Sequence, residues 1–205
     1  MEEPIVIEIL KNELGFSDFS IKKLKKFHNY LLEYNKRYNL ISKNTEKSIW
    51  IRHILDSAQI IKFIDTSKDN NIVDFGSGAG FQGLIIAFYT ENLRFHVKLY
   101  EKSPVKRAFL KNIKKELDIK NIDIENDVYG KKIAANIIVC RAFKKLEEIF
   151  KISREIVKKP HKLIILKGKN AQSEINNVSL GSNYSYKLEN SITKHDSKII
   201  IVDVK

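Results

Sequence analysis

The sequence predicts an α/β fold in which helices cover both faces of a mixed, mostly parallel, seven-stranded sheet that follows a helical cap. Three features predict it. From about residue 70 onward, short runs rich in Ile and Val alternate with segments of helical periodicity. The first 65 residues are helical in pattern. The last two apolar runs are suited to antiparallel pairing, which makes the sheet mixed.

The cap consists of two main predicted helices. Residues 17–40 place apolar side chains at helical spacing, and Ser17 or Ser20 can serve as the N-cap. A second helix is predicted over about residues 46–63, where an apolar stripe again recurs every three to four residues. Both helices lie before the first predicted strand, so we expect the cap to occupy residues 1–65.

The rest of the chain, residues 66–205, is expected to form one unit built on the sheet. Strands are predicted at residues 71–75, 94–101, 122–126, 135–140, 162–168, 184–192 and 197–205. Helices are predicted at residues 83–92, 104–117, 144–157 and 171–178. In such sheets ligands bind at the carboxyl ends of the strands, near the point where the strand order reverses. The site is therefore expected just after the parallel strands.

The amino-acid composition limits the classes of binding partner and the cellular compartment that we expect. The formal net charge of +12 favours a polyanion, either nucleic acid or an anionic membrane surface, although a general lysine-rich bias gives the same charge. The single cysteine, Cys140, excludes an internal disulfide and indicates a reducing, cytoplasmic compartment. No apolar run is long enough to span a bilayer, and we expect no membrane partner.

Residues 70–83, NNIVDFGSGAGFQG, join a predicted strand to a predicted helix. This loop holds four glycines: Gly76, Gly78, Gly80 and Gly83. Glycine permits positive φ and lets a ligand approach the backbone closely. A P-loop is excluded because no Lys-Ser or Lys-Thr follows. A NAD site stays open, since the spacing G-x-G-x-x-G is present and Glu101 lies about 20 residues further on.

Two acids favour a third ligand, S-adenosylmethionine. Asp74 lies inside the first strand, before the first glycine, and Glu101 ends the second strand. The order apolar-Asp-x-Gly-x-Gly-x-Gly, followed by an acid at the next strand end, is typical of class I methyltransferases with a Rossmann-like sheet. The residue types suit this cofactor, because Glu101 can accept hydrogen bonds from both ribose hydroxyls.

Several blocks beyond the loop resemble one family. They are YNKRYNLIS (34–42), RHILDS (52–57), IVDFGSGAGFQG (72–83), KRAFL (106–110), CRAF (140–143) and LKG (166–168). In this order they resemble the bacterial 16S ribosomal RNA guanine-N7 methyltransferases, also called glucose-inhibited division protein B. The glycine loop alone is generic to class I methyltransferases. The tyrosine-asparagine, Arg-His-x-x-Asp-Ser and Arg-Ala-Phe blocks together are specific.

The resemblance implies transfer of a methyl group from S-adenosylmethionine to N7 of a guanine in the decoding-centre loop of 16S rRNA, within the small ribosomal subunit or its precursor. We expect no DNA and no obligate protein partner. With the residue chemistry above, the predicted cofactor contacts are Gly76, Gly78, Gly80, Phe81, Glu101, Val128, Tyr129 and Arg141. Two features depart from the family: Gln82 replaces a frequent proline, and NDVYG (126–130) replaces the usual Arg-small-Glu stretch.

N7 of guanine carries a lone pair and no proton, so its methylation needs no general base. We therefore expect catalysis by proximity and orientation, with neither a catalytic side chain nor a metal. His53, Asp56 and Ser57 are neighbours on one predicted helix. We interpret Arg52 and Asp56 as an i, i+4 pair rather than as part of a catalytic triad.

RNA contacts are predicted at the end of the cap. If the cap folds over the strand ends, phosphates would meet Asn35, Lys36, Arg37, Asn39, Arg52 and His53. Tyr38, Phe81 and Phe143 are candidates for stacking on an extruded base. Two alternatives remain open: a NAD-linked oxidoreductase, and a non-catalytic, basic RNA-binding protein associated with the ribosome.

Overall fold

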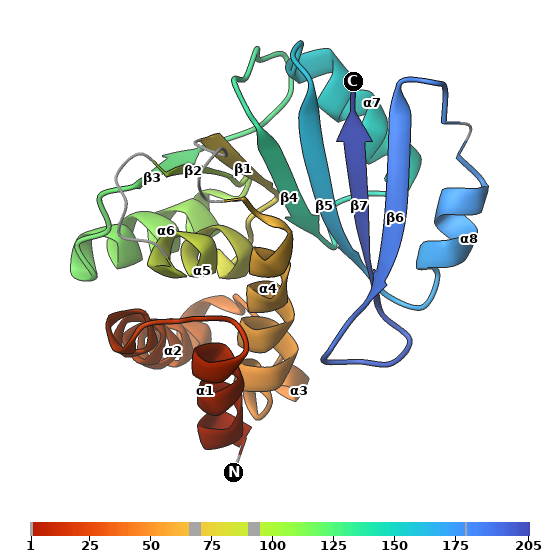
Figure 1. Ribbon diagram of the computed structural model, residues 1–205. Helices are drawn as coiled ribbons and strands as arrows, with labels where there is room; N and C mark the ends of the chain where they lie inside the picture. Colours follow the sequence, from red (N-terminus) through yellow and green to blue (C-terminus); the bar gives the residue numbers. More distant parts are fainter. Residues whose placement is uncertain (1, 66–70, 90–94, 179) are drawn as a thin grey trace.

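One mixed sheet organises the chain. The computed structural model describes residues 2–65, 71–89, 95–178 and 180–205. Its strands lie in the order β3-β2-β1-β4-β5-β7-β6 (Figure 1). Their bounds are β1 (Asn71–Phe75), β2 (His96–Tyr100), β3 (Ile122–Glu125), β4 (Ile137–Arg141), β5 (His161–Lys167), β6 (Tyr184–Asn190) and β7 (Lys198–Val204). β1 to β5 are parallel, whereas β7 pairs antiparallel with β5 and β6, which confirms the predicted mixed sheet.

Helices cover both faces of this sheet. Their bounds are α5 (Phe81–Tyr89), α6 (Pro104–Glu116), α7 (Leu146–Ile156) and α8 (Ala171–Asn176). Successive strand residues point to opposite faces, so Ile72 joins the core under α5 and α6, whereas Val73 joins the core under α7 and α8. Because the inner strands are covered on both sides, they read as continuous apolar runs.

The cap packs on the α5 and α6 side of the sheet, and its apolar residues share one core with those helices (Figure 1). Its elements are α1 (Glu2–Asn12), α2 (Asp18–Tyr38), α3 (Lys43–Glu46), the π-helical turn η1 (Trp50–Leu55), α4 (Asp56–Ala58) and the 3-10 turn η2 (Gln59–Phe63). The predicted boundary between cap and sheet unit, after residue 65, borders residues 66–70, which lie outside the described part.

The two predicted cap helices differ in how closely the structure follows them. The N-cap of α2 is Ser17, whose hydroxyl accepts a hydrogen bond from Ser20 N at 3.1 Å. The second helix, predicted as one piece, is divided. After α3, the consecutive helical segments η1, α4 and η2 form a helical rod from Trp50 to Phe63. A π-helical turn widens this rod at its start, and such turns occur often at functional sites.

Asp74 fixes the glycine loop from below. It is buried in β1, and its Oδ2 accepts a hydrogen bond from Gly83 N, in the first turn of α5, at 3.0 Å. A carboxylate is well placed at a helix N-terminus, where free N–H groups point outward. Burial nevertheless raises the pKa of Asp74 to about 7, while the hydrogen bond from Gly83 opposes the rise. The strand, the loop and α5 are therefore joined by a group that titrates near neutrality.

Replacing Asp74 with Asn should change how stability depends on pH. The pKa of Asp74 is raised from 3.8 to about 7, so the stability it contributes is full below pH 3.8 and is lost as the pH rises through 7. Asn keeps an acceptor for Gly83 N and carries no charge. We expect the stability advantage of Asp74→Asn over the parent to be about 1–3 kcal/mol larger at pH 8 than at pH 5.

The measurement is urea unfolding of parent and variant at both pH values. An equal difference in unfolding free energy at pH 5 and pH 8 would contradict the assignment, because the advantage of an uncharged replacement must grow as the pH rises from the unfolded toward the folded pKa of Asp74.

Candidate active site

Two neighbouring cavities lie at the carboxyl ends of the parallel strands, beside β1 and β4, where the strand order reverses. The first, the strand-end cleft, has a volume of about 350 Å³, and its lining includes Gly76, Gly78, Glu101, Asp127, Val128 and Tyr129. The second, the cap bay, has a volume of about 290 Å³, and its lining includes Leu40, Thr45, His53, Phe81, Gln82 and Arg141. Both cavities are lined by Gly76, Gly78, Lys106 and Ala142.

Internal packing excludes a side chain at three of the four loop glycines, Gly76, Gly80 and Gly83. A Cβ at Gly80 would lie 2.6 Å from Leu110 Cδ2, and one at Gly83 would lie 2.8 Å from Leu99 Cγ. Neither distance is compatible with a side chain, because protein interiors are close-packed. Gly80 is absent from the described lining of both cavities, so its predicted role as a cofactor contact stays a prediction.

Gly76 and Gly78 form the shared floor of the two cavities. The ring of Phe143 covers Gly76, with its Cδ2 atom 2.5 Å from the position of a Cβ. Gly78 faces open space: its φ is +60°, and the nearest atom to a Cβ would be the Gly76 carbonyl oxygen at 3.9 Å. Because no packing demands a glycine at position 78, its bare backbone is the part of the loop that a ligand can approach.

Glu101 is held in a fixed orientation at the end of β2. Its Oε2 accepts a hydrogen bond from Gly78 N at 2.8 Å, and its Oε1 accepts one from Ser103 N at 2.7 Å. The side chain is buried, yet it lines the strand-end cleft. A carboxylate has about four lone-pair sites, so both oxygens keep the capacity to accept a further hydrogen bond from a ligand.

The segment after β3 forms the far wall of the cleft. Val128 is buried and Tyr129 is exposed, and both line the cleft, while their contact with the cofactor stays a prediction. Asn126 and Asp127 line it as well, which the sequence analysis missed. Asp127 Oδ1 accepts a hydrogen bond from Tyr129 N at 3.2 Å, which shapes a tight turn. A polar pair at the end of a predicted strand was the signal available for them.

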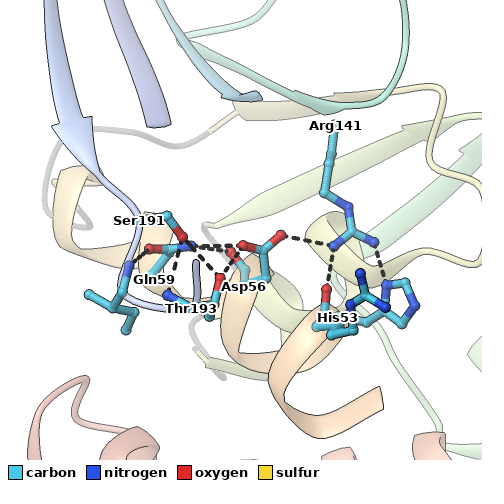
Figure 2. Close-up of polar contacts among 8 residues, drawn as sticks. His53, Asp56, Gln59, Arg141, Ser191 and Thr193 are labelled. Carbon is cyan, nitrogen blue, oxygen red and sulfur yellow. Dashed lines mark hydrogen bonds and ion pairs between the residues drawn. The ribbon is translucent and has the colours of Figure 1, made fainter. Parts of the chain in front are cut away.

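Arg141, at the end of β4, joins the cap to the sheet (Figure 2). Its Nη1 donates to Asp56 Oδ2 at 3.0 Å and to the Arg52 carbonyl oxygen at 3.1 Å. Asp56 Oδ1 also accepts hydrogen bonds from Thr193 Oγ1 at 2.7 Å and from Gln59 Nε2 at 3.1 Å. The β6–β7 connection is thereby tied to the same contact.

This geometry corrects the interpretation of Arg52 and Asp56 as an i, i+4 pair. The Asp56 carboxylate faces Arg141 from β4, and Arg52 supplies its backbone carbonyl to the same guanidinium. The Arg52 side chain is exposed. Arg141 itself lines the cap bay rather than the strand-end cleft, so its predicted contact with the cofactor stays a prediction.

Ala142 lies between Arg141 and Phe143, whose side chains line different cavities. Its φ of +51° is a left-handed conformation, which costs a non-glycine residue about 1–2 kcal/mol. Arg141 before it lines the bay, and Phe143 after it lines the cleft, where its ring lies 5.6 Å from that of Phe75. Strained residues of this kind cluster at functional sites.

The contacts of His53 fix its protonation and exclude a catalytic triad. Arg141 Nη2 lies 2.8 Å from His53 Nδ1, and because a guanidinium only donates, Nδ1 is the acceptor and Nε2 carries the proton. Burial lowers the pKa of His53 to about 4, and the charges of Arg141 and Arg52 add to this. Asp56 is turned away toward Arg141, and Ser57 Oγ has no partner among the described residues.

The predicted RNA contacts fall into two groups. Asn35 is buried, and its Oδ1 accepts a hydrogen bond from Ile41 N at 2.9 Å, so its carboxamide is committed to the chain itself. His53 stacks on Phe81 with ring centroids 4.6 Å apart and lines the bay. The remaining predicted contacts are exposed: Lys36, Arg37, Asn39 and Arg52.

The candidates for base stacking also differ. Tyr38 is about half exposed and lies against Tyr34 at a centroid distance of 5.9 Å. Phe81 is 5% exposed, with His53 stacked on its ring and Phe27 at its edge. Its ring is therefore largely enclosed by the chain.

Across the described residues, no helix is long and apolar enough to cross a membrane, and no cluster of metal-ligating side chains occurs.

Solved structures resemble the chain in fold. An O-methyltransferase from Bacillus cereus, solved in complex with SAH, gives a TM-score of 0.61 at 14% identity over 100% of both chains. M. jannaschii TYW2, solved in complex with AdoMet, gives a TM-score of 0.55 at 16% identity over 77% of each chain. At these identities the likeness concerns the fold alone, and it confirms the predicted class I S-adenosylmethionine-dependent methyltransferase fold.

Relatives found by sequence share a higher identity with the chain than these solved structures do. Two proteins named ribosomal RNA small subunit methyltransferase G resemble the chain over most of their length. The Rickettsia felis protein is 38% identical, over 89% of this chain and 92% of its own. The Orientia tsutsugamushi protein is 32% identical, over 97% of this chain and 98% of its own. The family model GidB, described as rRNA small subunit methyltransferase G, matches residues 20–199. The chain therefore belongs to the rRNA small subunit methyltransferase G family.

Proposed function

We propose that the chain transfers a methyl group from S-adenosylmethionine to N7 of a guanine in the decoding-centre loop of 16S rRNA. The target is reached in the small ribosomal subunit or its precursor, in the cytoplasm. One observation supports this beyond family membership. Two cavities share the floor made by Gly76 and Gly78, so two ligands can meet over the same backbone. A methyl donor and its acceptor need this arrangement.

The strand-end cleft fits the cofactor. Gly78 leaves room that none of the described side chains fills, and the oriented carboxylate of Glu101 stands at the neighbouring strand end. Val128 and Tyr129 provide an apolar wall for an adenine ring. Gly76, Gly78, Glu101, Val128 and Tyr129 would therefore hold the cofactor. When bound, S-adenosylmethionine supplies a methyl group on a sulfonium, which is already a strong electrophile.

The residues of the chain bind and orient rather than transfer protons. His53 cannot act as a base, because Nδ1 is occupied by Arg141 and Nε2 carries the proton. Attack by a lone pair needs no base, so positioning can account for much of the rate, which is worth roughly 7–11 kcal/mol in well-oriented systems. The left-handed turn at Ala142 contributes by fixing the wall between the cavities.

The cap provides the surface for RNA. Lys36 and Arg37 are exposed at the end of α2, and the chain from Leu40 to Ser42 then enters the wall of the bay. Phosphates beside an extruded base would meet these cations first.

Membership of a methyltransferase family sets aside the oxidoreductase alternative. A non-catalytic RNA-binding protein would show salt-dependent RNA binding without methyl transfer.

The decisive experiment is transfer of labelled methyl groups to small ribosomal subunits that lack the modification, followed by aniline cleavage at N7-methylguanine. We expect one labelled guanine in the decoding-centre loop. Label elsewhere would change the proposed target. Binding of S-adenosylmethionine without any label would contradict the proposed substrate.

Replacing Gly78 with Asp should abolish tight cofactor binding. The new carboxylate would fill the open space above the loop and would stand beside the Glu101 carboxylate, which lies within 2.8 Å of the Gly78 nitrogen. We expect the Kd for S-adenosylmethionine, measured by calorimetry, to rise at least about tenfold.

The matched control is Gly15→Asp. Gly15 also has a left-handed φ, +75°, and room for a Cβ, and it lies in the turn between α1 and α2. Both substitutions therefore strain the backbone alike, whereas only Gly78→Asp occupies the cleft. Equal cofactor affinity in the two folded variants would contradict the assignment of Gly78.

Reversing the charge at Arg37 should weaken RNA binding and leave cofactor binding intact. We expect Arg37→Glu to lower affinity for the small subunit and to reduce the slope of log K against log salt by about 1–2, since each phosphate contact contributes about one unit. Lys205→Glu is the control, because Lys205 is exposed beyond β7, at the opposite end of the sheet. Identical slopes for the two variants would show that the cap end is not the RNA surface.

A further inference from the structure

We propose that Gln82, together with His53, reads the O6 atom of the target guanine in the cap bay, an inference that rests on the proposed function. Gln82 is the second residue of α5, is 4% exposed, and lines the bay. Its Nε2 is shielded from solvent and has no hydrogen-bond partner among the described residues. Buried polar groups are nearly always paired, so an unpaired amide at a cavity wall indicates a group that bonds a ligand.

Gln59 shows what a structural glutamine looks like in the same molecule. It is 1% exposed, and its carboxamide is fully paired. Its Nε2 donates to the Asp56 carbonyl oxygen at 2.9 Å and to Ser191 Oγ at 3.0 Å, while its Oε1 accepts from Ile192 N at 2.9 Å (Figure 2). The Nε2 atom of Gln82, by contrast, has no hydrogen-bond partner among the described residues.

A second unpaired donor lines the same bay. The proton of His53 is on Nε2, because Nδ1 accepts from Arg141, and Nε2 has no partner among the described residues. Two residues that line the bay therefore carry an unpaired imidazole N–H and an unpaired carboxamide N–H₂, and both nitrogens are shielded from solvent. Rotation about the terminal torsion of Gln82, which is broad for a carboxamide, brings its N–H₂ group to the bay surface.

The two N–H donors have no hydrogen-bond acceptor among the described residues, and this favours guanine over adenine as the bound base. The edge of guanine that carries N7 also carries O6, and both are acceptors, whereas adenine presents N7 beside the N6 amino donor. The lone pair of N7 must stay free to receive the methyl group. O6 is thus the acceptor left for His53 and Gln82. Adenine would place its amino group against the His53 N–H, which has no acceptor to offer instead, a situation that sites reject strongly. Gln82 alone could turn its Oε1 toward that amino group, so discrimination against adenine rests on His53.

The location of the bay suits this role. It shares Gly76 and Gly78 with the cleft assigned to the cofactor, so a base held there lies over the same backbone. Its outer wall comes from Leu40, Ile41 and Thr45 of the cap, next to the cations proposed to bind phosphates. A base extruded from RNA would enter between these groups.

The test is Gln82→Met, which keeps the length of the side chain and removes its hydrogen bonds. We expect kcat/KM for unmethylated small subunits to fall at least about tenfold, as is typical when a buried bond to substrate is lost. The Kd for S-adenosylmethionine should change by less than about twofold. The melting temperature should stay constant or rise, because an unpaired buried amide is removed.

Gln59→Met is the matched control and should lower the melting temperature, since it leaves Ile192 N and the Asp56 carboxylate short of a partner. Parental kcat/KM in Gln82→Met would overturn the inference, and so would a loss of stability like that of Gln59→Met. The parent enzyme, run alongside, separates the two hypotheses. Absence of guanine label from the parent refutes the proposed function and this inference with it, whereas equal kcat/KM for labelling by parent and Gln82→Met refutes this inference alone.

Discussion

The guanidinium of Arg141 is the contact on which the rest of the site depends. It stands at the end of β4 and binds the Asp56 carboxylate, the Arg52 carbonyl oxygen and the His53 ring, all from one helical rod of the cap. The cap is therefore positioned by the sheet through a donor that never deprotonates. The same contact decides which nitrogen of His53 is a donor, and so sets the polarity of the bay wall. Because Asp56 also holds Gln59 and Thr193, the connection between β6 and β7 is aligned by the same carboxylate.

Backbone conformation, more than side-chain chemistry, shapes the two cavities. The left-handed φ at Ala142 turns the chain between Arg141 and Phe143, so that one residue faces each cavity. On the opposite side, Glu101 binds the loop through Gly78 N, and Asp74 binds the start of α5 through Gly83 N. The left-handed turn costs energy that only the surrounding packing can offset. A rigid floor and wall suit a reaction that depends on alignment of donor and acceptor rather than on proton transfer.

The sequence predicts well what depends on local pattern. The seven strands, the helices between them and the Ser17 cap follow from periodicity and capping chemistry, which act over a few residues. Contacts between distant residues do not follow from pattern. The Arg141–Asp56 pair joins positions 85 residues apart, so Asp56 was assigned instead to Arg52, its neighbour at helical spacing. The π-helical turn was equally invisible, because the apolar stripe that predicts a helix is nearly the same in both geometries. Asn35 looked like part of a basic surface, yet its burial depends on how the chain folds back at Ile41.

Unpaired buried groups carry information that motifs cannot. Motifs identify positions by residue type, and Gln82 differs from the residue frequent in the family, so pattern alone treats it as a departure. In the structure it is buried, and its Nε2 has no partner in the described part of the chain, beside a floor shared by two cavities. Folding gains nothing from such a group, since an apolar side chain of the same length would avoid the desolvation cost. Natural sequences depart from local rules mainly at functional sites, where the missing partner arrives with the ligand. The contrast with the fully bonded Gln59, equally buried in the same chain, separates an amide that the fold requires from one for which we propose a ligand.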